Sequence, residues 1–336
     1  MKRLITTFCF ILYSFSLFAA TVKIMSFNVN GIKNNRKNQN EQKRVANICN
    51  IIKESNADIV LLQEFDVKKG DPTKEIEAFR TKLGDGSWQS FCTVDYIKVK
   101  KNKFGKDIYS AQNNIILYNN RHVVPTSNRD FGIINFKTDS KYMFVKNNTQ
   151  VVEFCISGEP SKTFVVVNVH LPLYAENTKS NGEHNRFNYL HDLKALENLY
   201  YDLNLRGCKL IIGGDFNTKR ANSSGFDAGE VLKNKFSGAI IDSDWDFYCY
   251  PYGGLFTCGF DRGQKHIFPK LDIDHFIVKN LKIVKDTHLY LGLKRTESDN
   301  RHRPYVFKSN SMEFRLKEDY KKYVSDHLPI MIELEI

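Results

Sequence analysis

Residues that can bind a metal ion or move a proton stand where apolar segments of this 336-residue chain end. Glu64 follows the apolar run 59–62, and Asp215 and Asn217 follow another apolar run and two glycines. The other residues at such ends are Asn28, Asn168, His170, Asp274, Asp326 and His327. A carboxylate is costly to bury without a partner, a cation or solvent. One such residue is usually structural, but six such positions in chain order are hard to explain in that way.

The segments that must position these residues alternate between strands and helices. Strands are predicted over 22–29, 58–64, 112–118, 150–156, 163–170 and 209–213, and helices over 41–55 and 185–204. Residues 97–107 and 293–322 are rich in charge and are predicted as loops, either solvated or contacting a phosphate backbone. No linker rich in Pro, Gly or Ser divides the chain, which favours one catalytic domain over residues 21–336.

Six short motifs, taken in chain order, carry a family resemblance. They are Ser26-Phe27-Asn28-Val29-Asn30-Gly31, Leu62-Gln63-Glu64, Asn168-Val169-His170-Leu171, Gly214-Asp215-Phe216-Asn217, Ile273-Asp274-His275-Phe276 and Ser325-Asp326-His327-Leu328-Pro329. Together they resemble the endonuclease/exonuclease/phosphatase superfamily, and within it a secreted deoxyribonuclease-like member. The resemblance implies an α/β four-layer sandwich, in which two face-to-face β-sheets are flanked by helices. It also implies a site at one edge of that sandwich.

The predicted metal ligands are oxygen donors. Glu64 is the first candidate, because Mg²⁺ prefers hard oxygen ligands and retains several waters. The amide oxygen of Asn28 is a neutral donor, and Asp326 is expected to complete the metal environment. Mg²⁺ is the expected cofactor, with Mn²⁺ or Ca²⁺ as alternatives. The cation would polarise a phosphoryl oxygen and offset the charge that grows in the transition state.

An imidazole and a carboxylate are predicted to form the acid–base pair. His327 and Asp274 resemble the family's His–Asp pair, in which the carboxylate fixes the tautomer of the imidazole and raises its basicity. Asp272 faces the same side of the predicted strand as Asp274 and is the rival partner. Asp215 and Asn217 stand two residues apart, so in an extended segment they point the same way and can hold one phosphate or its attacking water.

A second histidine places the chain in one branch of the family. His170 resembles the histidine with which deoxyribonuclease- and sphingomyelinase-like members protonate the leaving oxygen. Pancreatic deoxyribonuclease backs that histidine with a Glu, and the best matching position here is Gln112, which cannot stabilise a charged imidazole as a carboxylate would. Asn168 is a candidate substrate contact. Arg186, which opens the long helix just beyond the His170 loop, is either a phosphate contact or an exposed helix charge.

The first twenty residues have the pattern of a secretory signal peptide. A basic start, Met1-Lys2-Arg3, precedes an apolar run from Leu4 to Ala20, and this run is short of the ~20 apolar residues that span a bilayer. The mature protein is therefore predicted to be secreted or periplasmic. Six cysteines follow the signal, an even number that permits disulfides, and Cys249 and Cys258 are the closest pair.

The surplus of positive charge favours a polyanionic substrate. The chain holds 49 Lys and Arg against 38 Asp and Glu, a formal net charge of +11. Together with Lys68, Lys69 and the basic segment 97–107, this charge favours an endonuclease acting on DNA. The alternatives are a sphingomyelinase-like phospholipid phosphodiesterase, for which the aromatic segment 248–256 would serve as a membrane hairpin, and a phosphoinositide phosphatase. A noncatalytic binding protein is disfavoured because every expected catalytic position holds a competent residue.

Overall fold

The computed structural model describes most of the chain in separate segments. These are residues 20–31, 38–65, 67–68, 72–84, 86–92, 97–101, 107–111, 114–126, 149–172, 182–217, 232, 234–241, 258–260, 269–271, 274–284, 293–294, 306–308, 313–314, 324–325, 327 and 329–336. Most residues of the predicted signal peptide, 1–19, lie outside these segments, so the signal stays a prediction.

The first large sheet has six strands in the order β16-β20-β1-β2-β7-β4. Their bounds are β1 Thr21–Asn28, β2 Ile59–Gln63, β4 Trp88–Cys92, β7 Ile115–Asn119, β16 Lys282–Ile283 and β20 Ile330–Glu335. β1 runs parallel to β2, so that Asn28 pairs with Gln63. The C-terminal β20 runs antiparallel to β1 on its other side. The segment just before β20, which includes His327, is thereby brought beside the end of β1.

The second large sheet has six strands in the order β12-β15-β11-β10-β9-β8. Their bounds are β8 Val123–Pro125, β9 Gln150–Ile156, β10 Glu159–His170, β11 Leu210–Asp215, β12 Ile240–Ile241 and β15 Asp274–Lys279. β11 continues two residues past the predicted strand, because its parallel pairing with β10 runs on until His170 lies beside Asp215. The polar strand ends of this sheet are therefore part of its hydrogen-bonded frame.

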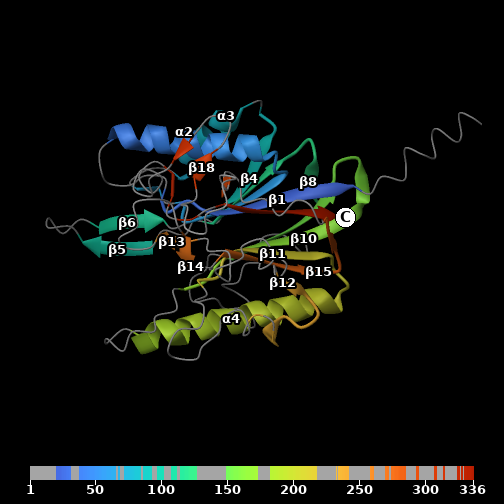
Figure 1. Cartoon of the computed structure of the whole chain (residues 1–336). Coiled ribbons are helices and arrows are strands. Elements are labelled where there is room, and N and C mark those ends of the chain that lie inside the picture. Colours follow the sequence, from blue (N-terminus) through green and yellow to red (C-terminus); the bar gives the residue numbers. More distant parts are fainter. Residues whose placement is uncertain are drawn as a thin grey trace, which may run out of the picture.

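Helices cover the outer face of each large sheet (Figure 1). α2 (Asn38–Ser55) and α3 (Pro72–Leu83) lie on the first sheet, and α4 (Gly182–Leu205) lies on the second. Three buried apolar clusters separate the four layers. The middle cluster joins residues of both sheets, such as Ile24 and Leu61 from the first and Ile211 from the second. The predicted four-layer α/β sandwich is therefore confirmed.

Three small sheets accompany the two large ones, in the orders β3-β6-β5, β13-β14 and β17-β18-β19. Their bounds are β3 Val67–Lys68, β5 Ile97–Lys101, β6 Asp107–Ala111, β13 Cys258–Phe260, β14 Pro269–Leu271, β17 Leu293–Lys294, β18 Val306–Lys308 and β19 Glu313–Phe314. The prediction of loops over 97–107 and 293–322 was therefore wrong in part. In β5 the lysines alternate with apolar residues, a strand period that the high charge of the segment obscured.

The thiols of three cysteines are unpaired in the structure. Cys49, Cys155 and Cys208 are free, and burial raises the pKa of Cys49 to about 12. Cys49 is thus a buried thiol in the apolar cluster beneath α2. The suggested pairing of Cys249 with Cys258 lies outside the described side chains. Among the described residues, no helix combines the length and apolar character needed to cross a membrane.

Candidate active site

The space between the two large sheets is apolar at one end and polar at the other. Along β10 the inward-facing residues are Phe164, Val166, Asn168 and His170 in turn, and all four are buried. The same change occurs along β1 (Val22, Ile24, Ser26, Asn28), β2 (Ile59, Leu61, Gln63), β11 (Ile211, Gly213, Asp215) and β15 (Val278, Phe276, Asp274). Side chains alternate along a strand, so these polar ends share one space at one edge of the sandwich.

Three predicted site residues stand in one row across the second sheet. His170 is the register partner of Asp215 on the parallel strand β11. Asp215 is in turn the partner of Asp274 on the antiparallel strand β15. Both carboxyl groups belong to residues that are only 1% exposed. Like charges placed directly opposite each other destabilise a sheet, so this pair needs a proton or a cation nearby.

His327 and Asp274 form a hydrogen-bonded pair. His327 Nδ1 lies 2.9 Å from Asp274 Oδ2, and both side chains are buried. Ser325 holds this segment in place: its hydroxyl donates to the Asn28 carbonyl at 2.7 Å and accepts from the His327 backbone N–H at 3.1 Å. With Nδ1 occupied by the carboxylate, Nε2 of His327 is left to face Asp215 Oδ2 at 3.8 Å. This is the arrangement of a general base whose tautomer is set by its carboxylate.

Glu64, His170 and Asn28 complete the cluster around the Asp215 carboxylate. His170 Nε2 lies 3.6 Å from Glu64 Oε1 and 3.7 Å from Asp215 Oδ2. Asn28 bridges the same two acids, since its Nδ2 donates to Asp215 Oδ2 at 2.9 Å and to Glu64 Oε1 at 3.3 Å. The two imidazoles therefore present Nε2 to one carboxylate oxygen, and proton donors and acceptors converge on one point.

Burial and a neighbouring carboxylate make the charged form of Asp215 costly. Burial first, and the Asp274 carboxylate second, raise the pKa of Asp215 to about 7 from 3.8. His327, the Asn28 amide and the backbone N–H of Asn217 act in the opposite direction but do not offset the rise. A carboxylate that needs this much compensation suits a site that also holds a cation.

The donor set fits a divalent cation. Asp215, Asp274 and His327 each offer a ligand atom, all within 4.8 Å of one another, and form a candidate metal site. Asp274 and His327 already bind each other, so the face of Asp215 toward Glu64 suits a hard cation such as Mg²⁺ better. The predicted ligand Asn28 turns its amide nitrogen toward these acids, and its oxygen accepts from the Asn30 backbone N–H at 2.9 Å. A ligand role for that oxygen requires the amide to rotate.

The backbone of the site adopts unusual conformations. Asn30, Glu64 and Asn217 are three of the five described non-glycine residues with positive φ, at 47°, 53° and 48°. Such conformations cost free energy and concentrate at functional sites. At Asn217 two hydrogen bonds hold this conformation. Its backbone N–H donates to Asp215 Oδ1 at 2.8 Å, and its side-chain amide donates to the Leu171 carbonyl at 2.8 Å. The segment is a turn closed by the Asp215 side chain, and the extended geometry predicted for 215–217 was wrong.

The other predicted residues divide into three groups. Asn168 is fully buried between the sheets and is held by other amides and carbonyls. His275 has a structural place, because its ring packs on Phe216 with the ring centroids 5.8 Å apart, on the face of the sheet opposite Asp274. Arg186 lies in α4, and its side chain is outside the described part. Asp326, Gln112, Asp272 and the segment 248–256 also lie outside the described residues.

Two residues that shape the site, Arg44 and Gly214, were assigned no role from the sequence. Arg44 of α2 is 2% exposed, and its guanidinium donates to the carbonyls of Val29 and, at 3.0 Å, Asn30. Gly214 has φ +149°, and a Cβ there would lie 2.0 Å from the Val169 carbonyl oxygen. An arginine within an otherwise apolar helix stripe, and a double glycine inside a strand, were the available signals.

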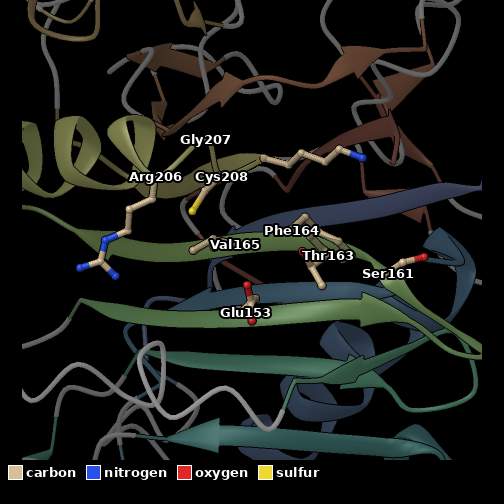
Figure 2. Close-up of a pocket in the computed structure, with 9 residues that line it drawn as sticks. Glu153, Ser161, Thr163, Phe164, Val165, Arg206, Gly207 and Cys208 are labelled. Atoms are coloured by element: carbon tan, nitrogen blue, oxygen red, sulfur yellow. The ribbon is translucent and has the colours of Figure 1, made fainter.

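A cavity of about 410 Å³ lies near the start of β10, at the end of the second sheet away from His170. Its lining includes Glu153 and Thr163 together with Arg206 and Cys208, which follow α4 (Figure 2). None of the predicted catalytic residues lines this cavity. The chemistry is therefore placed at the opposite end, where the polar strand ends converge.

This fold and this cluster of buried acids with two imidazoles define a class of enzymes that hydrolyse phosphoesters. The sequence profile of the Endonuclease/Exonuclease/phosphatase family matches residues 25–327, nearly the whole chain. The chain belongs to that family, and it is a phosphodiesterase or phosphatase of the family's fold. No curated protein matches its sequence.

Solved structures with the same fold cover almost all of the chain. An endonuclease/exonuclease/phosphatase family protein from Bacteroides thetaiotaomicron is 15% identical, with a TM-score of 0.52 over 94% of this chain and 95% of that one. The human Nocturnin catalytic domain is 12% identical, with a TM-score of 0.52 over 94% and 95%. A mannosyl-6-phosphatase from Bacteroides thetaiotaomicron is 16% identical, with a TM-score of 0.50 over 94% and 100%. At these identities the likeness establishes the fold.

Proposed function

We propose that the protein is an exported, Mg²⁺-dependent phosphodiesterase, and that it acts as an endonuclease on DNA. The observation that carries the proposal is the convergence of His170 and His327 on Asp215: their Nε2 atoms lie 3.7 and 3.8 Å from the same carboxylate oxygen. Two imidazoles placed around one reaction centre can take a proton from water and return one to the leaving oxygen.

The roles follow from the contacts. Asp274 holds His327 Nδ1, so Nε2 of His327 accepts the proton of the attacking water. His170, backed by the negative field of Glu64 and Asp215, carries the proton that the leaving oxygen receives. Asp215, whose Oδ1 accepts the backbone N–H of Asn217 at 2.8 Å, orients the water.

A bound Mg²⁺ supplies Lewis-acid polarisation of a phosphoryl oxygen. Glu64, Asn28 and Asp326 are the residues proposed to hold it, and Asp215 Oδ2 lies beside the first two, within 2.9 Å of the Asn28 amide nitrogen. Removal of the metal by a chelator is expected to abolish hydrolysis, and added Mg²⁺ is expected to restore it.

Charge supports a nucleic acid as the substrate. The net charge of +11 favours a polyanion. The basic segment 97–107 includes β5, which pairs with β6, and Lys68 belongs to β3 on the other side of β6 in the same small sheet. Binding through phosphate contacts predicts activity that falls steeply as salt is added. Export is proposed from the signal-like residues 1–20. To test it, the protein is recovered from the medium or periplasm of the host, and its N-terminus is sequenced.

One panel of substrates tests the activity. Plasmid DNA, RNA, sphingomyelin and inositol phosphates are incubated with wild type, His170→Ala and His327→Ala, each with Mg²⁺ and with chelator. We expect metal-dependent nicking of plasmid that falls about 10²- to 10⁴-fold in both variants. His122→Ala is the matched control, because His122 also pairs with a carboxylate, Asp58, but next to the start of β2, away from the site. Cleavage of a lipid or inositol phosphate with DNA left intact would overturn the nuclease assignment.

A further inference from the structure

A layer of uncharged polar side chains lies between the apolar half of the sandwich and the catalytic cluster. We define this amide layer as Ser26, Gln63, Gln150 and Asn168, which come from β1, β2, β9 and β10. All four residues are at most 1% exposed. Ser26 and Asn168 each stand two residues before the polar end of their strand. Gln63 ends β2 and Gln150 begins β9. The layer therefore lies directly between the apolar interior and the catalytic cluster.

Asn168 connects the two sheets through this layer. It belongs to β10 of the second sheet, yet its Nδ2 donates to the carbonyls of Leu62 and Ile115 in the first sheet, both at 3.1 Å. Its Oδ1 accepts from Gln63 Nε2 at 2.8 Å, and Gln150 Oε1 lies 3.5 Å from its Nδ2. One side chain thus engages two strands of the facing sheet and one neighbour in its own.

On each sheet, the hydrogen bonds of Asn168 involve a residue two positions before a residue of the catalytic cluster. Leu62 precedes Glu64 by two positions, and Asn168 precedes His170 by two. Glu64 and His170 face each other across the sandwich at 3.6 Å. Since hydrogen bonds restrict both distance and angle, they hold the sheets in one register, whereas apolar contacts alone permit sliding.

The layer is not arranged for stability alone. Gln63 Nε2 has three acceptors within hydrogen-bond distance, which are Asn168 Oδ1 at 2.8 Å, the Leu61 carbonyl at 3.1 Å and Ser26 Oγ at 3.2 Å. Its Oε1 is buried and has no donor among the described residues. An unsatisfied buried acceptor destabilises the folded protein, and an apolar side chain would avoid that loss. Because the layer lies beside the catalytic cluster and keeps this unfavourable group, we infer that it fixes the relative position of the two sheets at the cluster.

We propose that Asn168 is a positioning residue, which fastens the two sheets together so that Glu64, His170 and Asp215 keep their mutual spacing. It is fully buried, and its contacts are with the two sheets. This role replaces the substrate contact that its place in the motif suggested. The kinetic test of this inference rests on the proposed phosphodiester hydrolysis. A second test, by NMR of the histidine rings, does not depend on activity.

The kinetic test compares two substitutions in the same strand. Asn168→Ala removes the bonds to the first sheet, and Val166→Ala truncates the preceding inward-facing residue, which is also fully buried. We expect Asn168→Ala to lower kcat about 10- to 100-fold with KM within about twofold. Val166→Ala is expected to lose comparable stability in urea denaturation while kcat stays within about threefold. Gln63→Met, which removes the donor to Asn168 Oδ1, is measured alongside, so that a failure of Asn168→Ala to fold leaves the inference testable.

The outcomes separate the roles. A rise in KM with kcat preserved would show that Asn168 contacts the substrate and would overturn the inference. Equal losses of kcat in Asn168→Ala and Val166→Ala would reduce the role to stability and would also overturn it.

The activity-independent measurement is the NMR spectrum of the histidine ring nitrogens. We expect the His170 signals to shift in Asn168→Ala, while those of His122, which lies away from the site, stay unchanged. Unchanged His170 signals would refute the positioning role. A wild type that hydrolyses no phosphoester would refute the proposed function alone, because the ring signals would still report the geometry.

Discussion

Gly214→Ala should lower the activity of the protein about 10²-fold by moving Asp215. A Cβ at this position would lie 2.0 Å from the Val169 carbonyl oxygen and 2.8 Å from the carbonyl carbon, where real contacts essentially never fall below 3.0 Å. The clash is with backbone, so β10 and β11 must separate locally by about 1 Å. Overpacking costs about 1–3 kcal/mol, and a side chain at φ +149° costs about 1–3 kcal/mol more.

The shift is transmitted to Asp215, the next residue, whose partner on β10 is His170. A displacement of about 1 Å in a catalytic group lowers the rate on the order of 10²-fold. Kcat is measured on the phosphoester that wild type hydrolyses fastest, at a temperature where urea curves show the variant folded. Gly207→Ala is the matched control, because Gly207 also has positive φ (+69°) but nothing within 4 Å of the added Cβ. A folded Gly214→Ala variant with wild-type kcat would refute the reasoning.

Three further changes test other parts of the structure. Asp274→Asn should lower kcat about 10²- to 10⁴-fold in steady-state assays, because His327 loses the carboxylate that fixes its tautomer; an unchanged pH–rate profile would contradict this. Ser325→Ala should lower the free energy of unfolding by about 1–3 kcal/mol in urea, because the buried Asn28 carbonyl loses its donor. Above pH 9.0 the unfolded Cys49 thiol ionises while the folded thiol, with its pKa raised to about 12, stays neutral. Wild type should therefore lose stability relative to Cys49→Ala by up to about 1.4 kcal/mol per pH unit, and parallel curves would contradict this.

Much of the fold could be predicted because its strands are apolar and its polar residues mark their ends. The run 59–62 was predicted as a buried strand, and β2 is buried along its whole length, as a strand covered on both faces must be. β5 was missed because its lysines raised the charge of the segment above that of an ordinary strand. Its strand character shows only in the alternation of residues and in the pairing with β6.

The site could be predicted residue by residue only where the family motifs indicate which residues act together. The pairing of His327 with Asp274 followed from two motifs and is a 2.9 Å contact in the structure. The turn at Asn217 was not foreseen, because the Asp215 side chain accepts the backbone N–H of Asn217 and so takes the segment out of the extended conformation. A local competition of this kind depends on a side-chain rotamer, which residue types do not specify.

The sequence by itself determined the family, the layered fold and the identities of the polar strand ends, because alternation of apolar and polar residues is a local property of the chain. Only the tertiary structure decided which of those ends meet. Asp215 lies between His170 and Asp274 because of strand order and register, and Glu64 reaches His170 because two sheets face each other. The raised pKa of Asp215, about 7, likewise comes from burial and from a carboxylate 59 positions away in the chain. Contacts over such separations depend on packing between layers, which no local pattern records.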